Sequence, residues 1–530
     1  MSVNKQKLVK TGIWQVLNTV VVVLSQIVAN AIIVRYVSKQ EFGVMAITNT
    51  FINLASFISE AGMGDALMQR RDVEAQHKNA ALYFSFLFSC FLYLILYIAA
   101  PYISSFYPDA LVNNEPVLIP ALRVLGLSFI FLALGSSSLN LLMKRFNFKT
   151  VFFSDSLTLL LSNVLGVVLA MYGWGVWSLV YSILFYNVAR LVMVWIFEPI
   201  PIFLGAKLRH WKDLFSYGVG LTLVRFYNFV SGFGIILIIG KLIGTEQTGV
   251  YDRSYRITNI PVRYLGDMIQ KIMMPFMVKI NDQEDKLYAF FYRGMSLSNA
   301  LLVPISVFAI VFCQPIVTIL LGHKWESAVV PMQILFISLP FRITTKVADV
   351  LMRAKNLVFK NANRKLQYII VLCVGIVLFS KWGITGITAA VTGAAIFNYV
   401  FMLVTIKNHV FKKGWKKLII SPFKDGAVIA LISVLPSWGL YWLLNQLIKE
   451  EWLSFTILCA VLGLFLAFAF LKKPKLLGRD FVELRAQLMK MIKNKGKGGG
   501  KGKGKRKRQL LAEQEDNEAG STTDETTVSE

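Results

Sequence analysis

Long apolar runs recur from one end of the chain to the other, separated by short polar segments. Clear examples are "GIWQVLNTVVVVLSQIVANAIIV", "LYFSFLFSCFLYLILYIAA", "LLVPISVFAIVFCQPIVTILL" and "WLSFTILCAVLGLFLAFAFL". Each run covers about 20 residues, which lets an α-helix cross a hydrocarbon core about 30 Å thick. The short alternating segments of a membrane β-barrel are not seen in the sequence. The pattern therefore predicts an all-α polytopic membrane protein.

We expect about fourteen membrane-spanning helices. They are predicted near residues 13–34, 42–66, 80–100, 118–142, 150–171, 174–197, 214–243, 249–277, 288–321, 328–352, 365–380, 383–406, 423–447 and 452–471. The composition agrees, because 55% of the residues are hydrophobic and 16% are charged, whereas soluble domains average about a quarter charged.

Loop charge predicts the orientation. Lysine and arginine gather in alternate loops such as "QRRDVEAQHKN", "KLRHWK" and "KNHVFKKGWKK", whereas the long loop "PYISSFYPDALVNNEP" on the other side has neither. Since basic loops stay on the cytoplasmic side, both termini are predicted to be cytoplasmic.

The chain also carries an internal repeat. "YVSKQEFGVMAITNTF" near residue 36 resembles "LIGTEQTGVYDRSYRI" near 242, and "YGWGVWSLV" near 172 resembles "SKWGITGIT" near 379. The offsets, between about 206 and 211, indicate one duplication of six spans. Because six is even, both copies enter the membrane from the same side, as in parallel-repeat transporters. We expect a six-helix lobe over 1–200, a second over 201–410, two further helices over 411–472, and a tail over 473–530.

Charged side chains interrupt several predicted spans. In "YDRSYRITNIPVRYLGDMIQK", residues 251–271, the basic residues and Asp267 share one helix face, because a helix advances about 100° per residue. Pro261 predicts a kink midway. Neighbouring spans add further cations. The predicted cationic set is Arg225, Arg256, Arg263, Lys271, Arg342 and Lys346.

The cost of these charges indicates where they face. A central Arg or Lys costs about 2.5–3.5 kcal/mol on insertion scales, so several facing lipid would cost on the order of 10 kcal/mol. A helix lying on the membrane surface would break the inside/outside alternation of the loops and leave this span without its counterpart in the repeat. Snorkelling from span ends does not explain Arg263 and Arg342, which have apolar sequence on both sides. The stripes therefore predict a shared water-filled cavity between the lobes. Its excess of cations predicts an anionic solute, and the arginine fork suits phosphate or carboxylate.

Other polar side chains join these faces. The uncharged ones are Gln26, Asn30, Asn49, Asn53 and Asn228, and the carboxylates are Glu60, Asp267 and Asp349. The carboxylates could bind a proton or a sodium ion that drives transport, or they could only balance neighbouring arginines, and the sequence leaves both open.

The sequence offers no catalytic or metal-binding motif. The four cysteines, Cys90, Cys313, Cys373 and Cys459, lie in apolar runs without metal or disulfide spacing, and the four histidines are scattered. No Walker loop, nucleophile elbow or HExxH motif occurs. We expect no enzyme, no metal and no cofactor.

Three stretches carry a family resemblance: "EFGVMAITNTFINLASFISEAGMGDALMQRRDV", "TGVYDRSYRITNIPVRYLGDMIQKIMMPFMVKINDQEDK" and "LLGHKWESAVVPMQILFI". Over about residues 5 to 470 the chain resembles the Wzx-type polysaccharide flippases of the multidrug/oligosaccharidyl-lipid/polysaccharide exporter superfamily, especially colanic and teichuronic acid exporters.

The resemblance implies two six-helix bundles around a central cavity and alternating access by rocking of the lobes. It implies transport of an undecaprenyl-pyrophosphate-linked oligosaccharide repeat unit to the outer leaflet of a bacterial cytoplasmic membrane, for surface polysaccharide synthesis. The Asn and Gln stripe would then suit sugar hydroxyls, and polymerases and glycosyltransferases would be partners. The alternatives are a small-molecule exporter of the same superfamily and a non-transporting scaffold for glycan assembly.

The tail changes composition abruptly. "KNKGKGGGKGKGKRKR" is followed by the acidic "QLLAEQEDNEAGSTTDETTVSE", which predicts disorder. On a membrane protein, a basic run favours anionic lipid headgroups over nucleic acid, and a solvated tail is an equal alternative.

Overall fold

The computed structural model describes residues 5–59, 75–112, 115–145, 147–200, 234–411, 417–448 and 450–472. Within these ranges the regular structure is helical, apart from one isolated bridge between Val112 and Glu115. The predicted tail lies outside them, as do Glu60, Arg225 and Asn228.

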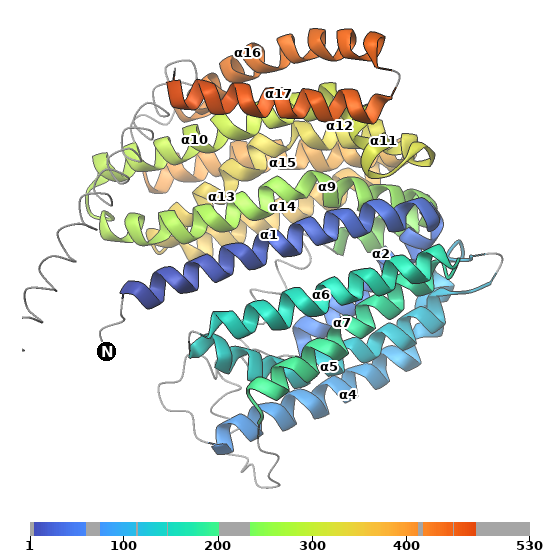
Figure 1. Cartoon of the computed structure of the whole chain (residues 1–530). Helices are drawn as coiled ribbons and strands as arrows, with labels where there is room; N and C mark the ends of the chain where they lie inside the picture. The colour runs from blue at the N-terminus through green and yellow to red at the C-terminus, as the bar shows by residue number, and fades with distance from the viewer. Residues whose placement is uncertain are drawn as a thin grey trace, which may run out of the picture. The chain divides into compact units, whose positions relative to one another are not determined.

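The first group of helices lies within residues 1–200. Its members are α1 (Lys5–Tyr36), α2 (Lys39–Ser59), α4 (Ala75–Phe106), α5 (Leu118–Lys144), α6 (Phe148–Met171) and α7 (Val176–Phe197). Helix α5 packs against α4, α2 and α7, and α6 packs against α1 and α7 (Figure 1). Apolar side chains such as Leu118, Leu122 and Phe129 of α5 are fully buried in the core of this group.

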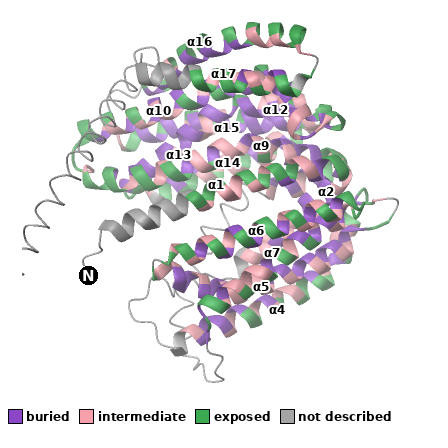
Figure 2. Ribbon diagram, in the orientation of Figure 1, coloured by how far each residue is buried: buried purple, intermediate pink, exposed green. Residues whose placement is uncertain are grey.

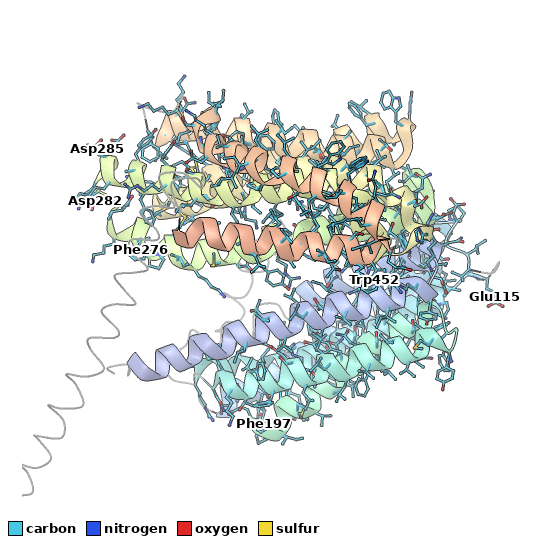
Figure 3. The ribbon with its side chains drawn as sticks, turned by 45° about the horizontal axis from the view of Figure 1, so that its top comes forward. Glu115, Phe197, Phe276, Asp282, Asp285 and Trp452 are labelled. Atoms are coloured by element: carbon cyan, nitrogen blue, oxygen red, sulfur yellow. The ribbon has the colours of Figure 1, made fainter. Side chains whose placement is uncertain are left out.

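The second group follows in the chain. Its members are α9 (Ile235–Lys279), α10 (Glu284–Val311), α11 (Cys313–Leu320), the 3-10 turn η2 (His323–Ala328), α12 (Val329–Ile337), α13 (Leu339–Ala354), α14 (Val358–Phe379), η3 (Ser380–Trp382) and α15 (Gly383–His409). Helix α13 packs against α9 and α15, and α14 packs against α15. Helix α9 ends beyond the exposed Phe276, near Asp282 (Figure 3).

Several predicted spans are interrupted in the structure. The segments predicted at 214–243 and 249–277 meet at Gly244, whose φ of 80° turns the chain inside α9. The segment predicted at 328–352 forms α12 and α13, bent by 42°. Pro340 stands in the first turn of α13, where a missing N–H costs no helical hydrogen bond. Within α9 the non-helical dihedral angles occur at Gly244. Pro261, where the sequence predicts a kink, keeps helical dihedral angles.

Among the described residues, eight helical segments are long and apolar enough to cross a membrane, or nine if the bent pair counts as one span. Their outward faces are apolar: Leu24, Val28, Ile98 and Val164 are each more than half exposed (Figure 2). Such faces suit lipid, since exposed apolar patches of this extent are unusual on soluble proteins. The count of about fourteen spans and the two six-helix lobes stay predictions.

In both groups of helices, a side-chain oxygen accepts a hydrogen bond from a backbone N–H at the start of another helix. Glu41 accepts a hydrogen bond from the backbone N–H of Val176, the first residue of α7, at 2.9 Å. Gln247 accepts one from the N–H of Ile384, near the start of α15, at 3.2 Å. The two acceptors, Glu41 and Gln247, are 206 residues apart in the sequence, and the two donors, Val176 and Ile384, are 208 residues apart. These contacts agree with the offsets of the sequence repeat.

Helices α16 (Lys417–Leu447) and α17 (Glu451–Lys472) belong, from residue 420, to a separate compact unit that also includes residues 295–304. Within this unit Gly426 of α16 lies directly against Asn299, because a Cβ on the glycine would be 2.5 Å from the Asn299 carbonyl oxygen.

Candidate functional site

Helices α2 and α9 cross with their backbones in contact. A Cβ added to Gly43 would lie 1.8 Å from the carbonyl oxygen of Thr245, and one added to Gly249 would lie 2.0 Å from that of Lys39. The contact is symmetric, since 245 minus 39 and 249 minus 43 both equal 206. Glycine is required at both positions because any larger residue would separate the two helices.

The same end of the helices is held by the segment "GHKWE" of the second group. Lys324 Nζ donates to the carbonyl oxygens of Arg35 and Val37, each at 2.9 Å, and Trp325 Nε1 donates to that of Val34 at 3.3 Å. These carbonyls lie in the last turn of α1 and just after it, where helical partners are missing. The Lys324 ammonium and the Trp325 indole satisfy them, and the ammonium also complements the helix dipole. We call this region, where α1 ends and α2 begins, the closed end.

The first group contributes a reciprocal contact at the closed end. The Asp109 carbonyl oxygen accepts hydrogen bonds from Thr245 Oγ1 at 2.6 Å and from Gln40 Nε2 at 3.2 Å. The Tyr107 hydroxyl donates to the Leu237 carbonyl oxygen at 3.1 Å. Burial raises the pKa of Tyr107 to about 12, so this hydroxyl remains a donor at physiological pH.

Next to the closed end, one buried carboxylate holds two arginines. Asp252, with 3% of its side chain exposed, accepts from Arg256 Nε at 2.8 Å and from Arg253 Nη2 at 2.7 Å. Arg253 turns toward the first group, where Nη1 donates to Asn30 Oδ1 at 3.0 Å and the guanidinium lies 4.4 Å from the ring centre of Phe42. Arg256 turns outward, with 44% of its side chain exposed.

The predicted cationic stripe of α9 is an exposed face beyond this cluster. Arg256, Arg263, Asp267 and Lys271 are all exposed, whereas Arg253 is only 12% exposed and faces α1 and α2. We call these four residues the α9 face. Its cations outnumber its single carboxylate, so the face has a net positive charge.

Helix α13 supplies two further cations beside α9. Arg342 Nη2 donates to Asn259 Oδ1 at 2.6 Å and to the Tyr255 hydroxyl at 2.9 Å, and its guanidinium lies 4.9 Å from the Tyr255 ring centre. Its buried Nη1 has no hydrogen-bond partner within the described ranges. The aliphatic stem of Lys346 passes close to Gly266, where an added Cβ would meet it at 3.5 Å. Both cations are therefore half-buried against α9.

Asp349, predicted as a candidate for ion coupling, is engaged in ion pairs. It accepts from Arg364 Nη2 at 2.5 Å and lies 3.5 Å from Lys365 Nζ. Arg364 is 2% exposed, and it also binds the side-chain oxygens of Asn361 and Asn398. These contacts favour the alternative that Asp349 balances neighbouring charge.

The polar residues of the first group lie along α1 and α2. Asn30 is exposed and contacts Arg253, and its Nδ2 donates to the Gln26 carbonyl oxygen at 2.7 Å. Asn53 Nδ2 donates to the Asn49 carbonyl oxygen at 2.7 Å, and both side chains are half-buried. Of this set, the structure brings Asn30 to the charged cluster.

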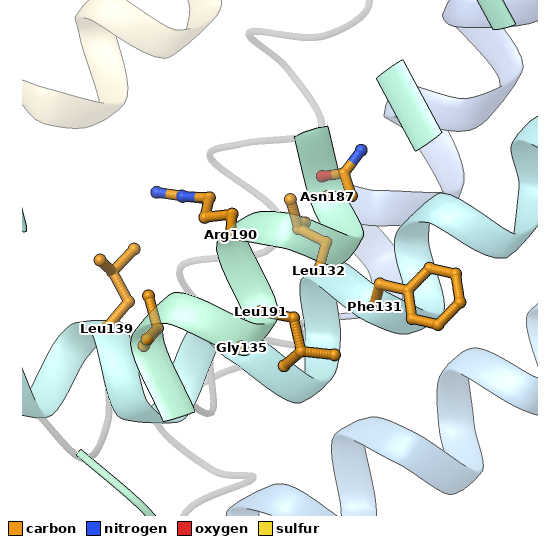
Figure 4. A pocket seen from close by; sticks show the side chains of 8 residues that line it. Phe131, Leu132, Gly135, Leu139, Asn187, Arg190 and Leu191 are labelled. Atoms are coloured by element: carbon orange, nitrogen blue, oxygen red, sulfur yellow. The ribbon is translucent and has the colours of Figure 1, made fainter. Parts of the chain in front are cut away.

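A separate small pocket lies within the first group (Figure 4). It is lined by Phe131, Leu132, Gly135, Leu139, Asn187, Arg190, Leu191 and Val194. Arg190 Nε donates to Asp155 Oδ1 at 2.7 Å, so this arginine has an internal counter-ion. No group of three possible metal ligands occurs among the described residues.

The chain matches known proteins over most of its length. The family model described as polysaccharide biosynthesis protein matches residues 32–330, more than half of the chain. The lipopolysaccharide biosynthesis protein WzxC of Escherichia coli K12 is 22% identical over 79% of this chain and 84% of its own. The teichuronic acid biosynthesis protein TuaB of Bacillus subtilis 168 is 24% identical over 61% of this chain and 66% of its own.

A solved structure supports the fold. The lipid II flippase MurJ, in an inward closed conformation, aligns with a TM-score of 0.64 over 87% of this chain and 98% of its own, at 14% identity. The long apolar helices and the family match together identify a multi-pass membrane protein, and the chain belongs to the polysaccharide biosynthesis protein family.

Proposed function

We propose that the protein is a flippase that carries an undecaprenyl-pyrophosphate-linked oligosaccharide repeat unit across the bacterial cytoplasmic membrane, for surface polysaccharide synthesis. The observation that carries the proposal is the net positive α9 face, together with Arg342 and Lys346 of α13. A pyrophosphate group supplies the matching negative charge.

The contacts of Arg342 support an anion-binding role. Two neutral side chains, Tyr255 and Asn259, accept hydrogen bonds from its Nη2, and within the described residues no carboxylate bonds to this guanidinium. Neutral partners leave the positive charge of this half-buried guanidinium without a counter-ion, and an unpaired buried N–H costs about 1–3 kcal/mol. An anion that reaches Nη1 of Arg342 would recover part of that cost.

Alternating access supplies the mechanism. We assign the closed end to the outer side of the membrane, with both termini cytoplasmic, so the protein accepts its substrate from the cytoplasm. Arg256, Arg263 and Lys271 would bind the pyrophosphate, and Gln26, Asn30, Asn49 and Asn53 would contact the sugars. Separation of α2 from α9 at the closed end would then release the substrate outward. Glycosyltransferases would act before this step and polymerases after it. The basic tail would bind anionic lipids.

Export of small cationic molecules is a less suitable function, because such solutes favour carboxylates and the α9 face has only Asp267. A scaffold for glycan-assembly enzymes would need no exposed cations in this position.

Complementation tests the proposal. In a strain that lacks the gene, Arg263→Ala and Arg342→Ala should abolish surface polysaccharide while protein level and membrane insertion stay normal. Lys286→Ala, which removes an exposed cation at the start of α10, is the matched control and should complement fully. Full complementation by both arginine variants would contradict the proposal. A transport-dead variant that still assembled with the glycan enzymes would separate transport from scaffolding.

A further inference from the structure

Asp252 lies between the anion-binding face and the contact that joins the two groups of helices. We propose that it is a positioning residue that links the two, so that anion binding at Arg256 strengthens closure of the closed end through Arg253. The inference rests on the proposed function, because it assumes that the α9 face binds the anionic part of the substrate.

The first role of Asp252 is to orient Arg256. Both carboxylate oxygens accept from the Arg256 Nε at 2.8 Å, one turn of helix away. This anchor uses Nε and leaves the two Nη groups at the end of a side chain that is 44% exposed. The guanidinium fork is therefore fixed in direction and can present two parallel N–H groups to a phosphate.

The second role is to hold Arg253 across the contact between the groups. Asp252 Oδ2 accepts from Arg253 Nη2 at 2.7 Å, while Arg253 Nη1 binds Asn30 of α1 and the guanidinium covers Phe42 of α2. Arg253 thus makes a hydrogen bond and a cation–π contact with the first group. Both contacts must break if α1 and α2 together separate from α9.

The two roles compete for one negative charge. An anion bound to Arg256 attracts that guanidinium and reduces its share of the Asp252 carboxylate, which then pairs more strongly with Arg253. By linkage, the closed state binds the anion more tightly than the open state, by the same factor. This direction of coupling suits an exporter, which binds the anion tightly while the outer side is closed and weakly once that side opens.

Thiol cross-linking of the purified full-length protein measures closure. Lys39 and Glu246 face each other across the closed end, with Nζ and Oε1 3.9 Å apart, so a Lys39→Cys/Glu246→Cys pair joined by a short bifunctional thiol reagent reports it. The cysteine pair is introduced into a variant in which the four native cysteines are replaced, and this variant must first complement the deletion strain. The measured quantity is the initial cross-linking rate with and without inorganic pyrophosphate. We expect pyrophosphate to raise the rate about fivefold or more, the lower range of typical allosteric coupling.

Variants then assign the coupling. Asp252→Asn and Arg253→Gln should abolish the response to pyrophosphate. Glu198→Gln is the matched control and should keep it, because Glu198 is also buried between two cations, Lys78 and Arg145, but within the first group alone. An unchanged response in Asp252→Asn, or none in the parent protein, overturns the inference. If Asp252→Asn does not fold, a normal response in Arg253→Gln does the same.

This experiment is independent of glycan transport. If Arg263→Ala abolishes surface polysaccharide but pyrophosphate leaves the cross-linking rate unchanged, the linkage fails and the proposed function stands. If pyrophosphate raises the rate but the protein moves no lipid-linked glycan, the linkage stands and the flippase proposal fails.

Discussion

The crossing of α2 and α9 allows a sharp test of the closed end, because a single methyl group suffices to disturb it. In Gly43→Ala the new Cβ would lie 1.8 Å from the Thr245 carbonyl oxygen, whereas real Cβ atoms essentially never approach below 3.0 Å. The obstacle is backbone and cannot rotate away, so the two helices must separate by about 1 Å. Such overpacking costs about 1–3 kcal/mol. The cost falls on the closed state, so the equilibrium should shift toward the open state by about 5- to 150-fold.

Two quantities are measured: the cross-linking rate of the Lys39→Cys/Glu246→Cys pair, and complementation of the deletion strain. Gly43→Ala should lower the cross-linking rate and reduce surface polysaccharide, and Gly249→Ala should do the same, because its Cβ would lie 2.0 Å from the Lys39 carbonyl oxygen. Gly393→Ala is the control, since a Cβ there meets nothing within 4 Å and the residue lies inside α15. If Gly43→Ala cross-links and complements like the parent protein, the backbone contact does not control closure.

Three further substitutions probe neighbouring contacts. Trp325→Phe removes the hydrogen bond to the Val34 carbonyl oxygen but keeps a ring, so it should weaken the closed end by about 1 kcal/mol and slow cross-linking several-fold. Asp349→Asn leaves Arg364 buried without its counter-ion, which should cost about 3–5 kcal/mol and lower the melting temperature of the purified protein; an unchanged melting temperature would contradict the ion-pair assignment. Glu41→Ala removes the acceptor for N–H groups at the starts of both α2 and α7, which should cost about 1–2 kcal/mol of stability in a thermal melt. Glu41→Gln should cost less, because it keeps an acceptor oxygen, as Gln247 does in the second group.

The sequence predicted the helices well because hydrophobic length is a strong local signal. It also predicted that Arg256, Arg263, Asp267 and Lys271 lie on one side of a helix, since spacings of four and seven residues fix a side once a helix is assumed, but it placed Arg253 with them. The 252 to 256 spacing could also have indicated the Asp252–Arg256 pair. The turn of Arg253 toward Asn30 could not be predicted, because it depends on how α9 packs against α1 and α2.

Arg364 shows a second limit. Its position before the apolar run of 365–380 placed it in a basic cytoplasmic loop. In the structure α14 begins at Val358, so Arg364 lies within the helix, where Asp349 and Asn398 surround it. Apolar periodicity gave no sign of this, because a buried arginine is stabilised by partners that are distant in the sequence. For the same reason the sequence could not name Arg364 as the partner of Asp349.

The closed end is built largely from main-chain atoms, namely the carbonyl oxygens of Val34, Arg35, Val37 and Asp109 and the backbones that meet at Gly43 and Gly249. Main-chain atoms are the same in every residue. A gate of this kind can therefore survive extensive sequence drift, provided that the glycines and a few donors such as Lys324 remain. The side chains of the α9 face take no part in this main-chain contact, so they can vary without disturbing it. Relatives that share 22–24% of their residues with this chain can therefore keep the same contact between α2 and α9 while the residues of this face differ.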